Sequence, residues 1–274
     1  MITVVGEALV DLVPAGDGIE PRVGGSPLNV AVGLARLGVA VRLLTGLGPD
    51  PYGDLVRAHL EEHGVPVVAA GLAATSTAGV RVDERGDATY DLRVDTTLPD
   101  ADLPPGGALH VGSLAAALAP GAATVDRLVS QARERGLPVS YDPNLRPGFV
   151  TAETPARVRA LAAAADVVKL SEDDAVLLAP GTDPATTALG LLGGSTGTVV
   201  LTRGARGATA YTTTASGTHR TDAAAVPVEV VDTVGAGDAF TAGLLAARLR
   251  DADLDEQLGS ALDSAAACCA RAGA

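Results

Sequence analysis

The sequence is poor in basic residues and cysteine and has no tryptophan. Lys and Arg total 20 across 274 residues, against 33 Asp and Glu, so the formal net charge is −13. A chain with this charge repels nucleic acid and anionic membranes at long range, which argues against both as partners. The two cysteines, Cys268 and Cys269, are neighbours in an expected helix. Because their side chains would point in different directions, no disulfide between them is expected.

Long uninterrupted apolar runs are also missing. No stretch approaches the roughly 20 apolar residues that a membrane-spanning helix needs. The opening segment, MITVVGEALVDLVP, lacks the basic start and long apolar region of a secretion signal and is typical of a β-strand. We therefore expect a protein of the cytoplasm, where free thiols are usual.

Lysine is nearly absent, and the position of the single one, Lys169, excludes two classes of nucleotide-binding enzyme. A P-loop needs Gly-Lys-Ser/Thr, whereas this lysine follows Val168. Protein kinases need a strand lysine after a glycine-rich loop and a His-Arg-Asp motif, and neither is present. The dinucleotide-binding pattern is represented only by GLGPDP at Gly46, which lacks the third glycine, so an NAD-dependent oxidoreductase is also disfavoured.

What the sequence does contain is a regular alternation of short apolar runs and helix-like segments, without a linker or an internal repeat. The expected strands are 2–5, 39–44, 65–69, 108–111, 138–141 and 167–170, and the expected helices are 28–37, 54–63, 124–135, 154–165 and 173–178. This alternation predicts an α/β fold with a mainly parallel sheet and helices on both faces. Two further antiparallel strands are expected in GATAY and THRTDAAAV, after Leu201.

One segment, Thr77–Asp95, departs from this alternation. Its pieces TAGVRVD and TYDLRVD alternate apolar and polar residues around the turn ERGD, which is typical of a β-hairpin with one wet face. A hairpin inserted in an α/β sheet is suited to form a lid or a dimer surface. A hairpin that only decorates the sheet edge is an equally good interpretation.

The strongest chemical motif is DTVGAGDAFTAGLL, residues Asp232–Leu245. A glycine-rich turn runs directly into a helix that is expected to begin near Asp238. Unpaired N–H groups and the positive end of the helix dipole make such a start an anion site. An aspartate beside it could accept a proton from a hydroxyl poised for attack on phosphorus. An isolated aspartate there would more often only complement the dipole, but the surrounding DTVGAGD favours the base.

Several motifs together resemble one known family. DTVGAGDAF resembles the C-terminal signature of the ribokinase-like (PfkB) carbohydrate kinases, and VGGSPLNVAVGLARLG resembles their N-terminal signature. GEALVDL, DPNLRP and VLTRGARGATAY occur in the expected order, so the resemblance covers nearly the whole chain. It implies one ribokinase-like domain over residues 1–274, with a mainly parallel sheet flanked by helices. It also implies a small β-sheet lid whose strands are inserted at about 12–22 and 77–95.

The resemblance also implies a role for each matched residue. Asp238 would be the catalytic base, and Gly235, Ala236 and Gly237 would form the anion hole for the transferring phosphoryl group. The sugar-binding residues would be Asp11, Gly24, Gly25, Asn29, Arg93 and Arg146. The nucleotide-binding residues would be Ser171, Thr202, Gly204 and Gly207, together with Gly235 and Gly237. For Arg93, a solvated surface position is an equally good interpretation.

The chain departs from the family where relatives often have Asn-x-x-Glu. Here the sequence is Ser171-Glu172-Asp173-Asp174. Asp174 could organise Mg²⁺ and its waters, or it could form a helix capping box with Ser171, and the sequence leaves both open. Asp232 is a second candidate metal ligand, for a monovalent cation such as K⁺. The expected last helix contains no asparagine, so contacts to adenine there are not predicted.

The resemblance implies ATP- and Mg²⁺-dependent phosphorylation of a primary hydroxyl of a small sugar. Fructose is the first expected acceptor and 2-keto-3-deoxygluconate the second, because the motifs are closest to kinases of these two compounds. The scarcity of basic residues near the sugar motifs disfavours a phosphorylated acceptor. A non-catalytic sugar or nucleotide sensor on the same fold is the alternative from another class. A homodimer formed through the lid is also expected.

Overall fold

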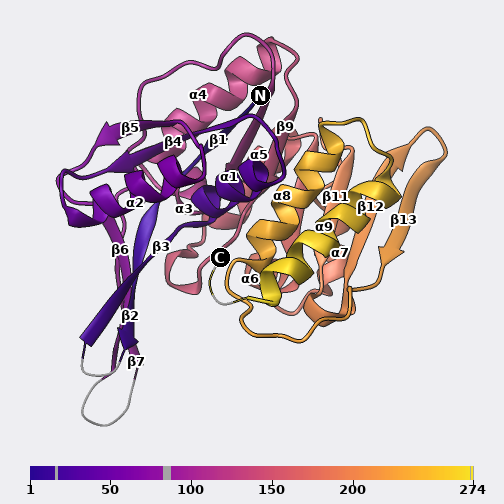
Figure 1. Cartoon of the computed structure of the whole chain (residues 1–274). Helices are drawn as coiled ribbons and strands as arrows, with labels where there is room; N and C mark the ends of the chain where they lie inside the picture. Colours follow the sequence, from indigo (N-terminus) through magenta and orange to yellow (C-terminus); the bar gives the residue numbers. More distant parts are fainter. Residues whose placement is uncertain (16–17, 83–87, 272, 274) are drawn as a thin grey trace.

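The chain folds around a large twisted sheet, and the computed structural model describes residues 1–15, 18–82, 88–271 and 273 (Figure 1). In this part of the chain the strands of the large sheet are, in spatial order, β13 (Gly217–Ala223), β12 (Ala208–Thr214), β11 (Thr198–Thr202), β10 (Val167–Ser171), β9 (Val139–Asp142), β8 (Ala108–Gly112), β1 (Ile2–Val5), β4 (Val41–Leu47) and β5 (Val67–Gly71). Neighbouring strands are parallel from β11 to β5 and antiparallel from β11 to β13.

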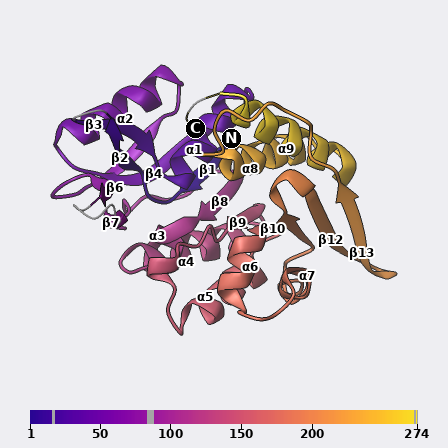
Figure 2. The ribbon, with the colours of Figure 1, turned by 90° about the horizontal axis from the view of Figure 1, so that it is seen from below.

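Helices cover both faces of this sheet, as Figure 2 shows. One face carries α1 (Ser26–Arg36), α2 (Pro51–Glu62), α8 (Ala236–Arg248) and α9 (Leu254–Cys269), and the other carries α3 (Ser113–Ala117), α4 (Gly121–Glu134), α5 (Thr154–Ala164), α6 (Glu172–Leu178) and α7 (Pro184–Leu189). Successive side chains of a strand point to opposite faces. In β10, Val167 therefore packs in the apolar cluster under α1 and α8, while Val168 and Leu170 pack under α4 and α5.

A second, smaller sheet extends away from the main body (Figure 1). Its order is β3 (Gly18–Gly24), β2 (Leu9–Ala15), β6 (Ser76–Val82) and β7 (Ala88–Arg93). The β6–β7 pair is antiparallel, which confirms the expected hairpin, although its turn ERGD lies outside the described residues. The sequence did not predict that β6 also pairs with β2, in parallel, with Ser76 beside Leu9.

The fold class predicted from the alternation is confirmed, with differences in detail. Helix α1 begins at Ser26, two residues before the expected start, because Pro27 has a fixed φ and lacks an N–H, which suits the first turn of a helix. Helix α3 was not predicted, since its five residues are too few to show helical periodicity. The last expected strand ends at Ala223 rather than continuing to Val226.

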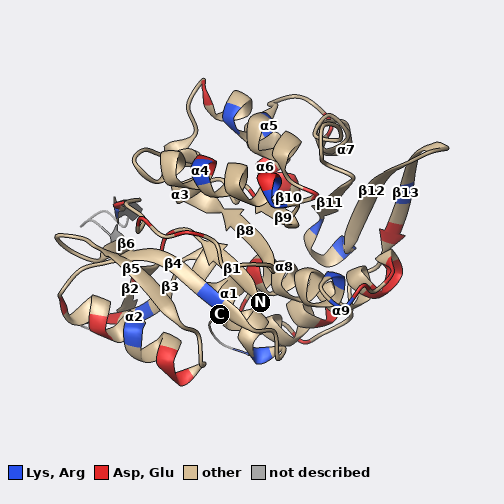
Figure 3. Cartoon of the chain, turned by 90° about the horizontal axis from the view of Figure 1, so that it is seen from above, with Lys and Arg blue, Asp and Glu red and all other residues tan. Residues whose placement is uncertain are grey.

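Acidic residues occur on helices of both faces of the sheet (Figure 3). Cys268 and Cys269 are free thiols, the first buried and the second partly buried. Within the described residues, every helix is too short or too polar to cross a bilayer.

Candidate active site

The glycine-rich turn before α8 presents unpaired backbone N–H groups. Gly235 caps the helix with φ 76°, a left-handed conformation that glycine adopts without strain. The N–H of Ala236 donates to the Thr233 carbonyl at 3.2 Å, whereas those of Gly235, Gly237 and Asp238 donate to no described residue. These three groups lie at the positive end of a 13-residue helix, which suits an anion. Of the residues expected to form an anion site, Gly235 and Gly237 therefore have such an N–H group, and the N–H of Asp238 lies beside them.

The Asp238 carboxylate does not cap its own helix but bonds across to α1. It accepts hydrogen bonds from Ser26 Oγ at 2.6 Å and from Asn29 Nδ2 at 2.8 Å. The two helices approach closely, since a Cβ on Gly33 would lie 2.7 Å from Ala242 Cβ. The interpretation of Asp238 as a mere complement to the helix dipole does not account for these two bonds.

Burial and polar contacts act in opposite directions on this carboxylate. Asp238 is only 9% exposed. Burial raises its pKa above the usual value, whereas the bonds from Ser26 and Asn29 and the charges of Lys169 and Arg146 lower it. The surroundings thus combine a desolvated carboxylate with groups that stabilise its ionised form, a combination typical of a general base.

A cavity of about 730 Å³ opens beside Asp238. Its lining comes from the small sheet, α1, α3, the segment 146–149 and the start of α8. The residues are Glu7, Leu9, Asp11, Gly25, Ser26, Asn29, Ala78, Gly79, Leu92, Ser113, Leu114, Arg146, Pro147, Gly148, Phe149, Val234, Gly235 and Asp238. The small sheet therefore forms one wall of the cavity, through Ala78, Gly79 and Leu92.

Two glycines allow the chain to pack tightly at this cavity. A Cβ on Gly24 would lie 2.3 Å from Asp11 Oδ2, and Gly25 has φ 105° and lies against the backbone, where a Cβ would be 2.8 Å from the Glu7 carbonyl oxygen. Burial raises the pKa of the Asp11 carboxyl, and the charge of Arg146 opposes this effect. The structure thus brings together the expected sugar-binding residues of β2, β3 and α1 with Arg146.

Arg93 lies elsewhere. At the end of β7 it is exposed and lines a different cavity, together with Asp50, Tyr52 and Thr75. Arg146 is close to its own turn, where Nη1 donates to Asn144 Oδ1 at 2.8 Å. Of the two arginines expected near the sugar, only Arg146 therefore borders the cavity beside Asp238.

Glu7 is a residue of this cavity to which the sequence analysis gave no role. It is 3% exposed, and its carboxylate accepts the N–H groups of Leu114 at 3.2 Å and Ala115 at 2.9 Å. Burial raises the pKa of Glu7, and its hydrogen bonds, including one from Ser113, lower it. The available signal was a glutamate placed between apolar residues in GEALVDL, where a charged side chain needs partners.

A buried ion pair lies below the glycine-rich turn and was also missed. Lys169 Nζ is 3.1 Å from Asp142 Oδ2, and the two side chains are 6% and 1% exposed. Thr241 Oγ1, on α8, donates to the same carboxylate oxygen at 3.1 Å. The sequence signal was a single lysine inside an apolar strand, VVKLS.

The Ser171–Asp174 segment forms the capping box that the sequence left open. The Asp174 N–H donates to Ser171 Oγ at 3.0 Å, and the Ser171 N–H donates to Asp174 Oδ2 at 2.9 Å. The other oxygen, Oδ1, accepts the Leu145 N–H at 2.7 Å, and Asp174 is 3% exposed. This carboxylate is therefore fixed in the protein framework, and the geometry does not favour it as a Mg²⁺ ligand.

The remaining residues expected at the nucleotide lie at the carboxyl ends of β10 and β11. Ser171 and Thr202 are direct neighbours in the two strands. Gly204 and Gly207 flank a 3-10 turn, with φ 55° and 84°. Gly207 also has a structural reason to be glycine, since a Cβ there would lie 2.0 Å from the Ala223 carbonyl.

Asp232 connects the turn to the end of the chain. Its Oδ1 accepts the Val234 N–H at 3.0 Å, and its Oδ2 accepts the Gly273 N–H at 3.1 Å. These bonds lower the pKa of its carboxyl. On the other side, Cys268 Sγ lies 3.4 Å from the Val234 carbonyl, so α9 also supports the turn.

Comparison with known proteins gives consistent matches over this whole chain. A family model described as "pfkB family carbohydrate kinase" matches residues 1–274. A fructokinase from Rhizobium leguminosarum bv. trifolii is 33% identical, with 97% of this chain and 85% of the relative covered. A fructokinase from Klebsiella pneumoniae is 38% identical, with 89% and 83% covered.

Solved structures agree with these relatives. A double mutant of fructokinase from Vibrio cholerae O395, in fructose, ADP and potassium ion bound form, superimposes with a TM-score of 0.83 at 29% identity, covering 99% of this chain and 93% of the other. Aminoimidazole riboside kinase from Salmonella enterica, complexed with aminoimidazole riboside and an ATP analog, gives a TM-score of 0.84 at 27% identity, covering 99% and 94%. The family resemblance predicted from the motifs is confirmed.

Proposed function

Because the chain belongs to the pfkB family of carbohydrate kinases, we propose that it transfers the γ-phosphoryl group of ATP to a primary hydroxyl of fructose. That the protein is a sugar kinase follows from the family and from relatives that are named fructokinase. Such relatives leave little support for a non-catalytic sensor. The proposal concerns the acceptor and the residues that carry out the transfer.

The position of Asp238 is the observation that carries this proposal. Its carboxylate faces the cavity, while its own N–H and those of Gly235 and Gly237, at the helix start, donate to none of the residues that the structure describes. A carboxylate at this place can take a proton from a sugar hydroxyl, and the N–H groups can stabilise the charge on the transferring phosphoryl group.

In the proposed reaction, the acceptor O–H bond breaks and its proton goes to Asp238. The acceptor oxygen forms a bond to the γ-phosphorus as the bond between that phosphorus and the β,γ-bridging oxygen breaks, so ADP leaves with the electron pair. Ser26 and Asn29 hold the carboxylate in place throughout, because each donates to a different carboxylate oxygen. Such positioning is a large part of catalysis in phosphoryl transfer.

A neutral sugar suits the cavity better than an acidic one. The lining contains the carboxylates of Glu7, Asp11 and Asp238, against the single guanidinium of Arg146, which interacts with Asp11. The carboxylate and amide of Asp11 and Asn29 are suited to sugar hydroxyls. Arg146 is the observation that keeps 2-keto-3-deoxygluconate as the second candidate acceptor, because a sugar acid needs one cation for its carboxylate.

We also propose how Mg²⁺ and K⁺ would be bound. Mg²⁺ neutralises developing charge on ATP phosphates and is bound mainly by those phosphates, by water and by few carboxylates. Since Asp174 is engaged in its capping box, we propose that Mg²⁺ enters on ATP rather than on a preformed protein site. For K⁺, Asp232 remains the candidate ligand, and it would have to share oxygens that already accept N–H groups.

The small sheet is proposed to act as the lid. Ala78, Gly79 and Leu92 border the cavity, so movement of this sheet would open or close it. A closed lid excludes water, which otherwise competes with the sugar for the phosphoryl group. Pairing of two small sheets in a homodimer is part of the same proposal, supported by the exposed Ile19 on β3.

The experiment is coupled ADP release with MgATP and a panel of fructose, 2-keto-3-deoxygluconate, ribose, glucose, adenosine and fructose 1-phosphate. We expect turnover with fructose, and loss of it in Asp238→Ala. The matched control is Asp255→Ala, because Asp255 is also in the first turn of a helix but is exposed and outside the cavity. Preference for another acceptor would contradict the fructose assignment, and full activity of Asp238→Ala would contradict the base.

A further inference from the structure

The buried pair of Lys169 and Asp142 has no part in the mechanism above, yet it lies next to the reacting groups. In β10, Val168 and Leu170 point toward α4 and α5, so Lys169 points to the opposite face, toward α8. The register places Val168 beside Tyr141 in the neighbouring strand, so Lys169 follows beside Asp142. Sheet geometry therefore fixes both charges on the face that carries the catalytic helix.

The pair is costly to bury and is only partly satisfied. Lys169 Nζ contacts Asp142 Oδ2 at 3.1 Å, but Asp142 Oδ1 is buried without a hydrogen-bond partner among the described residues. Removing two charges from water usually costs more than their attraction returns, so a buried pair is weak evidence for stability. Stability alone therefore does not explain why the single lysine of the chain is buried at this position.

The ammonium group lies directly below the anion-binding turn. A Cβ on Gly237 would be 3.2 Å from Lys169 Nζ, so the glycine gives the ammonium room at this point. Thr241 Oγ1 lies 3.1 Å from Asp142 Oδ2 and 3.0 Å from the Gly237 carbonyl, and so connects the pair to the turn. The pair therefore lies against the turn, and Thr241 is placed between Asp142 and Gly237.

We propose that Lys169 is a positioning residue for phosphoryl transfer, whose buried ammonium, held by Asp142 below Gly237, keeps the Asp238 carboxylate ionised and supports the anion-binding turn. The inference rests on the proposed role of Asp238 as the base. It adds a buried cation that stabilises the ionised base from a position in the sheet where solvent cannot screen its charge.

The charges around Asp238 predict the direction in which its pKa should change when a neighbouring charge is removed. The titratable and charged groups that interact with it are Lys169, Asp142, Arg146 and Cys268, and Glu7 and Asp11 line the same cavity. Lys169 lowers the pKa of Asp238, and Asp142 and Asp238 compete for the same ammonium. Burial, opposed by Lys169, raises the pKa of Asp142 to about 6. Removing the lysine charge should therefore raise the pKa of Asp238, and removing the Asp142 charge should lower it.

The test compares the pH dependence of kcat/KM in Lys169→Met and Asp142→Asn with the wild type. The acid limb of this profile reports ionisation of the base in the free enzyme. We expect it to move up by about one pH unit or more in Lys169→Met and to move down in Asp142→Asn. A residue with only a structural role would lower activity without moving the two limbs in opposite directions.

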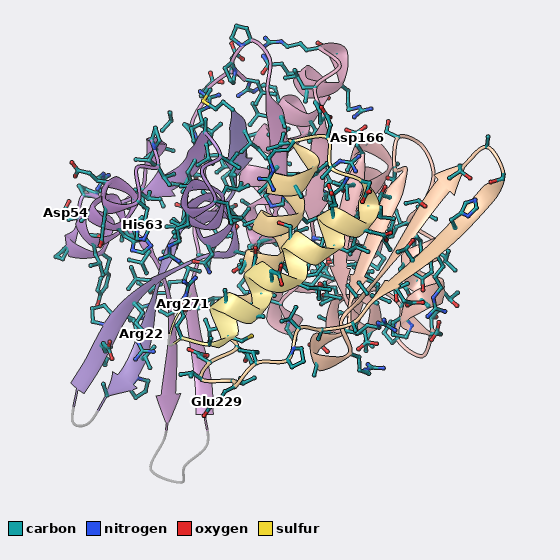
Figure 4. The ribbon with its side chains drawn as sticks, turned by 45° about the vertical axis from the view of Figure 1, so that its right-hand side comes forward. Arg22, Asp54, His63, Asp166, Glu229 and Arg271 are labelled. Atoms are coloured by element: carbon teal, nitrogen blue, oxygen red, sulfur yellow. The ribbon has the colours of Figure 1, made fainter. Side chains whose placement is uncertain are left out.

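The matched control is Arg133→Met. Arg133 pairs with Asp166 at 2.8 Å, and Figure 4 shows Asp166 at the end of the sheet away from the small sheet and Arg22. This variant loses a partly exposed ion pair outside the cavity beside Asp238, and its acid limb should stay in place. If Lys169→Met does not fold, Asp142→Asn decides by itself, because it is nearly isosteric and its limb must move down.

A second measurement does not depend on turnover. Aspartate labelled with ¹³C at the carboxyl carbon gives an NMR titration of Asp238, which is assigned by its disappearance in Asp238→Asn. We expect the midpoint to move in the same opposite directions in the two variants. Unmoved midpoints would overturn the inference even if the wild type phosphorylates sugar, whereas moved midpoints without turnover on any sugar would count against the proposed function alone.

Discussion

The carboxylate of Asp238 and the hydroxyl of Ser26 meet at 2.6 Å although 212 positions separate them in the chain. One residue is in the first turn of α8 and the other begins α1. The two motifs that define the family at opposite ends of the sequence are therefore a single site in space, and each supplies what the other lacks. Helix α8 brings the carboxylate and N–H groups, and α1 brings the donors that orient the carboxylate.

Replacing the base should remove catalysis and leave nucleotide binding. In Asp238→Asn the side chain keeps its shape but can no longer accept the proton, so kcat should fall roughly 10²- to 10⁴-fold. ATP affinity, measured by calorimetry, should change less than about threefold, because the N–H groups of the turn remain. Asp255→Asn is the control and should behave as the wild type. A parallel loss of ATP affinity and kcat would instead indicate a disordered turn.

The Ser26 hydroxyl should control the pH range of activity. Its hydrogen bond lowers the pKa of Asp238, so Ser26→Ala should raise that pKa and move the acid limb of kcat/KM to higher pH. Loss of a bond to a buried carboxylate should also lower the free energy of unfolding by about 1–3 kcal/mol. Ser264→Ala removes a hydroxyl that bonds within α9 and serves as control. An unchanged acid limb would show that the hydroxyl only aids packing.

Because Gly24 has no side chain, it leaves space for the Asp11 carboxylate at the proposed sugar site. A Cβ there would lie 2.3 Å from Asp11 Oδ2, so Gly24→Ala must displace the Asp11 carboxylate. We expect the KM for sugar to rise about tenfold or more, as for the loss of a hydrogen bond to a charged group, with the KM for ATP unchanged. Gly259→Ala, where a Cβ would meet open space, is the control. Equal effects on both substrates would contradict a role limited to the sugar.

Asp142 should make stability depend on pH. Burial raises its pKa from 3.8 to about 6 in the folded chain, so its contribution to stability is fully present below pH 3.8 and is lost as pH rises through about 6. Over this window the unfolding free energy of the wild type should fall relative to Asp142→Asn by roughly 3 kcal/mol. Denaturant unfolding at pH values from 3 to 7.5 measures the difference. Parallel curves for the two proteins would contradict the prediction.

Local patterns were enough to predict much of the fold and the centre of the site. Alternating apolar runs predicted the parallel sheet, and the motif around Asp238 predicted the start of α8 to within two residues. These features depend on neighbours in the sequence. The small sheet was only partly predicted, because the parallel pairing of β2 and β6 joins segments that are far apart in the chain.

Lys169, Asp142 and Glu7 were missed in the sequence analysis for one physical reason: their partners are distant in sequence. Lys169 and Asp142 are 27 residues apart and meet only through strand register. Glu7 meets Leu114 and Ala115 across more than 100 positions. The bond of the Ala236 N–H to Thr233 is local, but it depends on the conformation of the turn, which the residue types in DTVGAGD do not specify.

The division of the cavity between the small sheet and the helices has a consequence for how such an enzyme can change. The groups proposed to accept the proton and bind the phosphoryl group belong to α8 and the turn before it, whereas Ala78, Gly79 and Leu92 belong to the small sheet. Substitutions in that wall can reshape the space for the acceptor while the reaction chemistry stays intact. Selection for a new sugar can therefore act on one part of the molecule without dismantling the other, and the same separation gives protein engineers a place to begin.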